Sequence, residues 1–164
     1  MTENVAIRLI RPDDAARLER LFYRLSPESV YRRFFTLYTT PPPGVMCRLV
    51  EVDHDTRDAA VAVAGDEIVG VGRYAADPAE PGAAELAVVV DDAWQGHGLG
   101  SRLLALAAGL ARLHGYTVLT AVVLADNAPA IRMLRTAFPE AHWRLDGGEY
   151  ELRIPLGTDE RIPA

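Results

Sequence analysis

One stretch constrains the fold of this chain more than any other, and it runs from Glu85 to Leu104. It begins with a run of β-branched residues, passes through a short glycine-rich turn, and continues as an alanine- and leucine-rich segment with helical spacing. Glycine allows a sharp backbone turn and lets a ligand approach main-chain N–H groups closely. The helix that follows directs its unpaired first-turn N–H groups and the positive end of its dipole at the turn. Strand, turn and helix together predict an anion site suited to phosphate.

Three phosphate-binding glycine motifs have this outline, and the spacing distinguishes them. A P-loop requires a lysine after its second glycine, but all 17 basic residues of the chain are arginine. The dinucleotide motif G-x-G-x-x-G would have its third glycine at Ser101, and the strands before it form no βαβ unit. The third motif, Q/R-x-x-G-x-G/A, is the turn that binds the pyrophosphate of coenzyme A. Gln95–Gly100 (QGHGLG) matches it in full.

Composition is that of a globular protein. Of the 164 residues, 49% are hydrophobic and 24% are charged, which predicts one domain over residues 1–164 with a core from about 5 to 156. We expect the tail after Gly157 to be flexible. No apolar run approaches the ~20 residues that a membrane span needs, and Met1–Asn4 lacks the start of a secretory signal. The single cysteine, Cys47, excludes an internal disulfide and fits a reducing, cytoplasmic location.

The charge balance restricts the ligands that the chain could bind. A net charge of −6 argues against a general nucleic-acid-binding protein, which would present a basic face. It also means that an anionic ligand must be held locally, by loop amides and arginines, because the overall field opposes it.

Hydrophobic periodicity and turn residues predict an ordered series of elements. The predicted strands cover residues 5–10, 59–64, 68–74, 84–90, 118–124, 142–145 and 150–154. Helices are predicted over about 14–25, 27–35, 45–52, 100–114 and 128–138. Ser26 is the expected N-cap of the second helix, and Pro27 its first residue. By itself this pattern indicates one α/β or α+β domain.

The glycine turn, its flanking strand and helix, and Asn127 further along resemble the GNAT superfamily of acetyl-CoA-dependent N-acetyltransferases. The resemblance runs from about Val5 to about Ile154, and the predicted order of elements is the GNAT order. It implies an α/β fold: a single GNAT-like domain with a mixed, mainly antiparallel central sheet flanked by helices. It also implies an acyltransferase activity with acetyl-CoA as co-substrate and without a metal ion.

The resemblance further implies which residues bind acetyl-CoA. Main-chain groups of Val88 and Val90 would pair with the pantetheine arm, as an added β-strand would. The turn would hold the pyrophosphate through its amides, and its residues are Gln95, Gly96, His97, Gly98, Leu99, Gly100 and Ser101. Within it we expect the His97 side chain to point to solvent or to the edge of the ligand. Asn127 has two interpretations, a helix cap and a contact with the pantetheine region.

One acidic residue matches a catalytic position of the family. Glu85 lies ten residues before Gln95, close to where the general-base glutamate of the family stands; the alternative is a solvated residue at the strand edge. Leu134 stands where many members have a tyrosine that protonates the departing thiolate, so the resemblance breaks there. A thiol with a pKa near 8.5 is a fair leaving group without such a donor. Asp91 and Asp92 are expected to be turn residues.

Two segments before the turn, Ile10–Asp14 and Leu25–Phe35, resemble bacterial protein lysine acetyltransferases of the Pat type. This resemblance implies a protein lysine as acceptor and direct transfer in a ternary complex, so that no nucleophile is required. Two alternatives stay open: a small-molecule amine as acceptor, and a non-catalytic acyl-CoA-binding or sensing domain. Neither a nucleic acid nor a membrane is expected as a partner, and the sequence is compatible with an oligomer.

Overall fold

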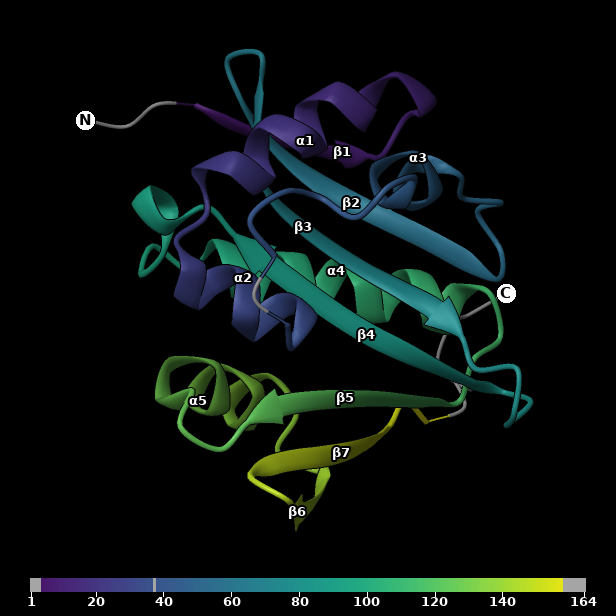
Figure 1. Ribbon diagram of the computed structural model, residues 1–164. Helices are drawn as coiled ribbons and strands as arrows, with labels where there is room; N and C mark the ends of the chain where they lie inside the picture. Colours follow the sequence, from purple (N-terminus) through teal and green to yellow (C-terminus); the bar gives the residue numbers. More distant parts are fainter. Residues whose placement is uncertain (1–3, 37, 158–164) are drawn as a thin grey trace.

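The computed structural model describes residues 4–36 and 38–157 and contains a seven-stranded sheet with helices on both faces (Figure 1). The strands are β1 Val5–Leu9, β2 Arg57–Ala64, β3 Glu67–Ala76, β4 Ala83–Val90, β5 Val118–Leu124, β6 His142–Asp146 and β7 Glu149–Pro155. The helices are α1 Ala15–Arg24, α2 Pro27–Phe34, α3 Val45–Val50, α4 Leu99–Leu113 and α5 Ala128–Ala137, with 3₁₀ turns η1 Pro12–Asp14 and η2 Asp92–Trp94. The flexible tail expected after Gly157 falls on residues 158–164, outside the described residues.

The sheet confirms the predicted fold class, a mixed and mainly antiparallel sheet in an α/β domain. Its strand order is β1-β2-β3-β4-β5-β7-β6. β4 and β5 pair in parallel, and the other neighbours pair antiparallel. The order of helices and strands along the chain is the predicted one, with the two 3₁₀ turns added.

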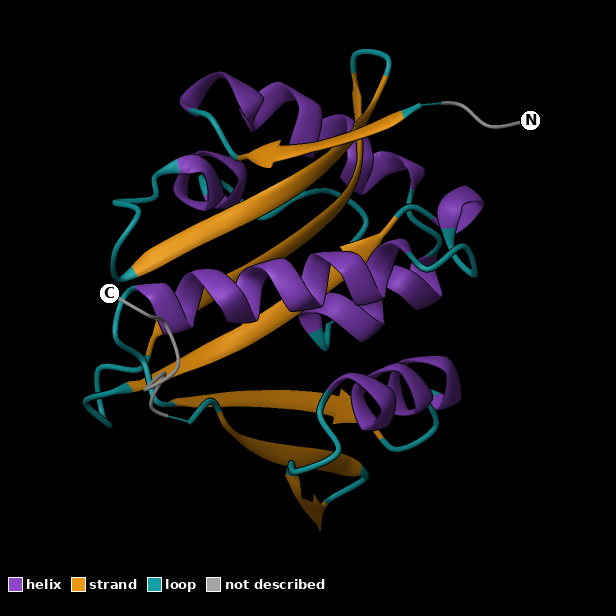
Figure 2. Cartoon of the chain, turned by 180° about the vertical axis from the view of Figure 1, so that it is seen from behind, coloured by secondary structure: helices purple, strands orange, loops and turns teal. Residues whose placement is uncertain are grey.

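The helices form two layers on the sheet. α1, α2 and α3 lie on the face turned to the viewer in Figure 1, and α4 and α5 lie on the face that Figure 2 presents. α4 buries the stripe of residues that its spacing predicts. The predicted residues Leu103, Leu104, Ala107 and Ala111 are buried, Leu110 is only partly buried, and Ala108 is buried as well. Among the described residues, no helix is long and apolar enough to cross a membrane.

β4 and β5 separate soon after they begin to pair. Their parallel register covers only Ala83–Glu85 against Val118–Thr120. β4 nevertheless stays paired with β3 as far as Val90. The two strands therefore diverge, as Figure 1 shows, and leave one edge of β4 without a strand partner from Leu86 to Val90.

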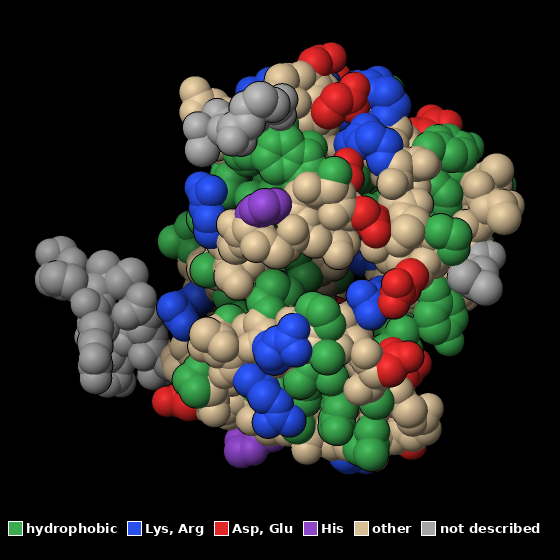
Figure 3. Space-filling view, turned by 90° about the vertical axis from the view of Figure 1, so that its left-hand side faces the viewer, with side chains coloured by type: hydrophobic (Ala, Val, Ile, Leu, Met, Phe, Trp, Pro, Cys, Tyr) green, Lys and Arg blue, Asp and Glu red, His purple; other side chains and the backbone are tan. Residues whose placement is uncertain are grey.

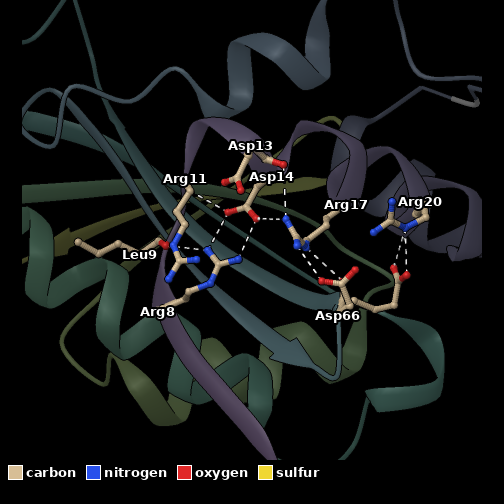
Figure 4. Close-up of polar contacts among 9 residues, drawn as sticks. Arg8, Leu9, Arg11, Asp13, Asp14, Arg17, Arg20 and Asp66 are labelled. Atoms are coloured by element: carbon tan, nitrogen blue, oxygen red, sulfur yellow. Dashed lines mark hydrogen bonds and ion pairs between the residues drawn. The ribbon is translucent and has the colours of Figure 1, made fainter.

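A network of charged side chains fixes the first helix to the sheet (Figure 4). Asp14 is fully buried, and its carboxylate accepts hydrogen bonds at 2.8 Å from both Nη atoms of Arg8 and from the Arg11 N–H. Arg17 contacts Asp14 and also reaches Asp66, in the turn between β2 and β3, at 2.7 Å. The Arg8 guanidinium holds the pKa of Asp14 below its usual range, although burial acts to raise it. These pairs join α1 to both β1 and the β2–β3 hairpin.

α4 approaches β3 so closely that the strand requires glycine. A Cβ at Gly72 would lie 2.6 Å from the main-chain oxygen of Leu103, and one at Gly70 would lie 2.8 Å from Leu103 Cδ1. The first of these clashes is with backbone, which cannot rotate away. Because α4 begins directly after Gly98, this contact also sets how far the glycine turn lies from the sheet.

Gly72→Ala should therefore lower the free energy of unfolding by about 1–3 kcal/mol, the usual range for overpacking. Gly109→Ala is the matched control, because Gly109 lies inside α4 and a Cβ there meets no atom within 4 Å. Alanine is the better helix former by about 1 kcal/mol. Urea unfolding should thus shift the two midpoints in opposite directions. Equal stability of both variants and the unmodified protein would contradict the close approach of α4 to β3.

Candidate functional site

The glycine turn, Gln95–Gly100, connects η2 to α4, and its glycines serve different purposes. Gly96 and Gly98 both have a φ of +81°, in the left-handed region that favours glycine, and a Cβ at either would meet no atom within 4 Å. Gly100 has an ordinary backbone, but a Cβ there would lie 2.9 Å from the Sδ of Met133 in α5. Two glycines thus shape the turn, and the third lets α5 approach it.

The first turn of α4 is open to a ligand. Ser26 caps α2 and Asn127 caps α5 through side-chain oxygens, whereas Gly98 gives α4 no side-chain cap. The N–H groups that begin a helix have no partner within it. Together with the helix dipole, they form a site for an anion at this turn.

A cleft of about 390 Å³ joins this turn to the open edge of β4, and we call it the β4–β5 cleft. The residues that line it are Ser29, Arg32, Arg33, Val88, Val89, Val90, Trp94, Gln95, Gly96, Gly98, Gly100, Ser101, Asn127, Pro129, Ala130 and Met133. Figure 3 shows the side of the molecule on which α2, the turn and α5 lie, with a hollow between two parts of the surface. Its blue side chains are arginines, since the chain contains no lysine.

The structure brings most of the predicted acetyl-CoA-binding residues together in this cleft. Two turn residues are not among its lining residues. The side chain of Leu99 is buried in the core, and His97 is exposed, as expected for a side chain that points to solvent.

The main chain of β4 is directed toward the cleft at alternate residues. The Asp91 N–H donates to the Val69 carbonyl at 2.9 Å, which continues the β3–β4 ladder. Because main-chain groups alternate between the two sides of a strand, Val88 and Val90 direct theirs away from β3, to the open edge. The Gln95 side chain donates to the Val90 carbonyl at 2.9 Å and to Ser29 Oγ at 3.3 Å. Gln95 therefore holds the turn against β4 and α2.

Asn127 is a helix cap, which confirms one of its two interpretations. Its Oδ1 accepts a hydrogen bond from the Ala130 N–H at 3.3 Å, and its carbonyl accepts from the Ile131 N–H at 3.0 Å. The residue is also part of the cleft wall. Its contact with a ligand stays a prediction.

Glu85 lies at the point where β4 and β5 separate. It forms the last parallel pair, with Thr120, and its side chain is exposed. It lines a second cavity, which shares Arg33 and Asn127 with the β4–β5 cleft. Leu134 also lines this second cavity and is buried. A leucine side chain has no O–H group, so it cannot protonate a departing thiolate. The Glu85 carboxylate thus stands where the gap between β4 and β5 begins.

Asp91 and Asp92 do more than form a turn. Asp91 accepts a hydrogen bond from the Ala93 N–H, and it also pairs with Arg24 of α1 at 2.8 Å. Asp92 accepts from the Ser26 N–H at 3.0 Å and from Ser29 Oγ at 3.1 Å. Burial acts to raise the pKa of Asp92, but these hydrogen bonds outweigh it and lower the pKa. Both carboxylates attach the first two helices to the start of the turn.

Two arginines beside this site, Arg33 of α2 and Arg73 of β3, were not predicted as functional residues from the sequence. Arg73 is only 8% exposed, and Arg33 lines the β4–β5 cleft and the cavity of Glu85. A single charged residue inside the apolar run of β3 was the available signal. Across the described ranges, 4–36 and 38–157, no group of three or more His, Cys, Asp or Glu side chains is arranged to hold a metal ion.

Comparison with known proteins assigns the family. Residues 18–138 match the family model described as "Acetyltransferase (GNAT) family". Acetyltransferase PA5475 of Pseudomonas aeruginosa is 32% identical over 128 residues, which cover 76% of this chain and 68% of that protein. The GNAT domain of S. lividans PAT is 30% identical and superposes with a TM-score of 0.84, over 92% of this chain and 90% of that one.

A more distant solved structure has the same fold. It is a GNAT superfamily phosphinothricin acetyltransferase from Sinorhizobium meliloti in complex with AcCoA, 18% identical, with a TM-score of 0.75 over 97% of this chain and 92% of that one. The family model spans well over half of the sequence and includes β4, the glycine turn, α4 and α5. This chain therefore belongs to the GNAT acetyltransferase family.

Proposed function

We propose that this protein transfers an acetyl group from acetyl-CoA directly to a primary amine, and that the amine is a lysine side chain of another protein. Enzymes of this family are acetyltransferases, with acetyl-CoA as the donor. The observation that carries the proposal is the arrangement of the β4–β5 cleft, where an open strand edge leads from an uncapped helix N-terminus to Glu85.

The two ends of the cleft suit the two ends of the donor. In this proposal the amides from Gly96 to Ser101 bind the pyrophosphate, since they combine free N–H groups with the dipole of α4. The open edge at Val88 and Val90 pairs with the amides of the pantetheine arm, in the manner of an added strand. Asn127 lies across the cleft from this edge as a further contact. The S. meliloti neighbour, which is a complex with AcCoA, supports this assignment at the level of the fold.

Glu85 is the proposed general base. A lysine amine has a pKa near 10.4, so it is charged at pH 7, and only the neutral amine can attack a thioester. Deprotonation costs roughly 4.6 kcal/mol at that pH, at ~1.36 kcal/mol per pH unit. Glu85 would accept this proton, directly or through one water, as the nitrogen bonds to the carbonyl carbon. The C–S bond then breaks, and coenzyme A leaves as a thiolate that takes its proton from water.

The proposed acceptor class derives from the segments that resemble Pat-type lysine acetyltransferases, and the 30% identity to the S. lividans GNAT domain supports it. α2, which carries part of this resemblance, forms one wall of the cleft through Ser29, Arg32 and Arg33. Direct transfer requires no nucleophilic side chain. Cys47, the single cysteine of the chain, is exposed on α3, away from the strands that separate.

Glu85→Gln should lower kcat at pH 7 by about 10²–10⁴-fold, the usual contribution of a positioned base. The affinity for acetyl-CoA should stay unchanged, because the proposed donor contacts are main-chain groups further along. The deficit should narrow as the pH rises, since more of the amine is then already neutral. Rates of coenzyme A release between pH 6 and pH 10 measure both effects.

Glu140→Gln is the matched control for this variant, because Glu140 is exposed on the loop before β6. It should turn over like the unmodified enzyme at every pH. A Glu85→Gln enzyme that is equally active at pH 7 would make Glu85 a surface residue and rule out its role as base.

Incubation of the protein with isotope-labelled acetyl-CoA and a cell lysate should label lysine side chains of proteins, detected by mass spectrometry. The enzyme itself contributes no background, because it contains no lysine. Gly98→Asp is the control, since a carboxylate at the turn should repel the pyrophosphate and abolish labelling. Label confined to free small amines would assign the small-molecule alternative, and binding of acetyl-CoA without any transfer would assign the sensing alternative.

A further inference from the structure

A third cavity, on the α1–α3 face of the sheet, contains two guanidinium groups in apolar surroundings, and we call it the arginine cavity. Its two charged residues are Arg33 and Arg73. The remaining lining residues are Leu18, Leu21, Phe22, Leu25, Phe34, Met46, Leu49, Val71 and Val89. It lies beneath the first three helices, and Val89 and Arg33 separate it from the β4–β5 cleft.

Neither guanidinium has an anionic partner in the described part of the chain. Arg73 donates one hydrogen bond, from Nη1 to the Leu49 carbonyl at 3.2 Å. Within the described ranges, no carboxylate oxygen lies within 4.0 Å of Arg33 or Arg73. The neighbouring arginines differ, since Arg32 pairs with Glu28 and Arg24 pairs with Asp91. Every fully buried side-chain nitrogen among the described residues has a partner, so each guanidinium nitrogen that lacks one retains some accessible surface.

At Arg73 this arrangement opposes stability, whereas the Arg33 guanidinium lies 4.9 Å from the centre of the Phe34 ring in a cation–π contact. A buried charge without a counter-ion is expensive to desolvate, and apolar residues of similar size would cost less. Burial, together with the nearby Arg33, lowers the pKa of Arg73 to about 10. Burial also lowers the pKa of Arg33, while Glu85 acts to raise it. Groups perturbed in this way concentrate at functional sites.

The sheet register brings this pair close to Glu85. Arg73 stands opposite Ala87 on β4, and Ala75 stands opposite Glu85, so Arg73 and Glu85 project from the same face of neighbouring strands on a diagonal. Arg33 approaches from α2 and lines the arginine cavity, the β4–β5 cleft and the cavity of Glu85. An anion held by both arginines would therefore lie next to the proposed base.

We propose that Arg33 and Arg73 bind a carboxylate that the acceptor carries near its reactive amine. This inference rests on the proposed function, and it narrows the acceptor class to amines with a neighbouring carboxylate. Guanidinium groups suit this role, because their planar N–H groups match the two oxygens of a carboxylate. Arg33 lines both the arginine cavity and the cleft, but Arg73 is not part of the cleft wall, so we assign the anion to the acceptor rather than to the donor.

Two sources of the carboxylate can be separated with matched acceptors. The first arm compares L-leucine with L-leucinamide, which tests the carboxylate of a free amino acid; a preference confined to this arm would support the arginine site but replace the protein lysine by a small-molecule acceptor. The second arm compares amidated, N-acetylated peptides with one lysine and either glutamate or glutamine beside it. In each arm kcat/KM is measured for both partners at saturating acetyl-CoA. The ratio of the two is then compared between enzyme variants, so that differences in amine basicity cancel.

In at least one arm, kcat/KM of the unmodified enzyme should be higher for the acceptor with the carboxylate than for its neutral counterpart. Arg73→Met should reduce the ratio of these two kcat/KM values by on the order of 10- to 100-fold, as for a lost hydrogen bond to a charged group. Turnover of the neutral partner should change by less than about threefold. Arg73→Lys should keep part of the preference, because it keeps the charge. Arg144→Met, at an exposed arginine of the β6–β7 hairpin, is the matched control and should leave the ratio unchanged.

Arg73→Met should also melt at the same or a higher temperature, since it removes a desolvated charge. A lower melting temperature with equal losses on both partners would assign Arg73 to the fold and contradict the proposal. Turnover without carboxylate preference in either arm would refute the arginine site and leave the acetyltransferase proposal intact. Absence of acetyl transfer to every amine would instead refute the proposed function.

A third arm replaces acetyl-CoA by succinyl-CoA. An Arg73-dependent preference for succinyl-CoA would move the anion to the donor and overturn the acceptor assignment.

Discussion

The early end of the β4–β5 pairing is the constraint on which the rest of the structure depends. Three parallel pairs join the strands, and beyond Glu85 the edge of β4 has no strand partner. Exposed strand edges invite pairing with another extended chain. Here the edge is bounded by the glycine turn at one end and by a carboxylate at the other. A single structural event, the separation of two strands, thus creates both the proposed binding surface and the position of the proposed base.

The surrounding elements hold this opening in place. α4 packs on β3 through the contact at Gly72, which fixes the helix N-terminus relative to the sheet. Gln95 joins the turn to β4 and α2, and Asp92 joins the turn to the cap of α2. On the other side, Met133 of α5 packs against Gly100. The cleft is therefore built from rigid elements, as a site that must align a thioester with an amine requires.

Much of the fold and of the site could be predicted from the sequence because the signals are local. The left-handed backbone at Gly96 and Gly98, and the cap at Ser26, depend on neighbouring residues. The purpose of Gly100 was not predictable, since its contact with Met133 joins distant parts of the chain. The position of Arg73 was not predictable for the same reason, because it depends on the β3–β4 register and on the apolar helices that cover that face of the sheet. Glu85 could be proposed from the family resemblance, but its location at the point of strand separation required the sheet.

Residue-resolved amide hydrogen exchange tests the central claim, that the open edge of β4 binds the donor. With coenzyme A at about 100 times its Kd, exchange at the Val88 and Val90 amides should slow by up to roughly 100-fold, because each opening must then release the ligand. Ala87 and Val89, whose main-chain groups face β3, are internal controls and should change little. Slowed exchange in the turn, with no change at Val88 and Val90, would show that the donor does not pair with this edge and would contradict the account.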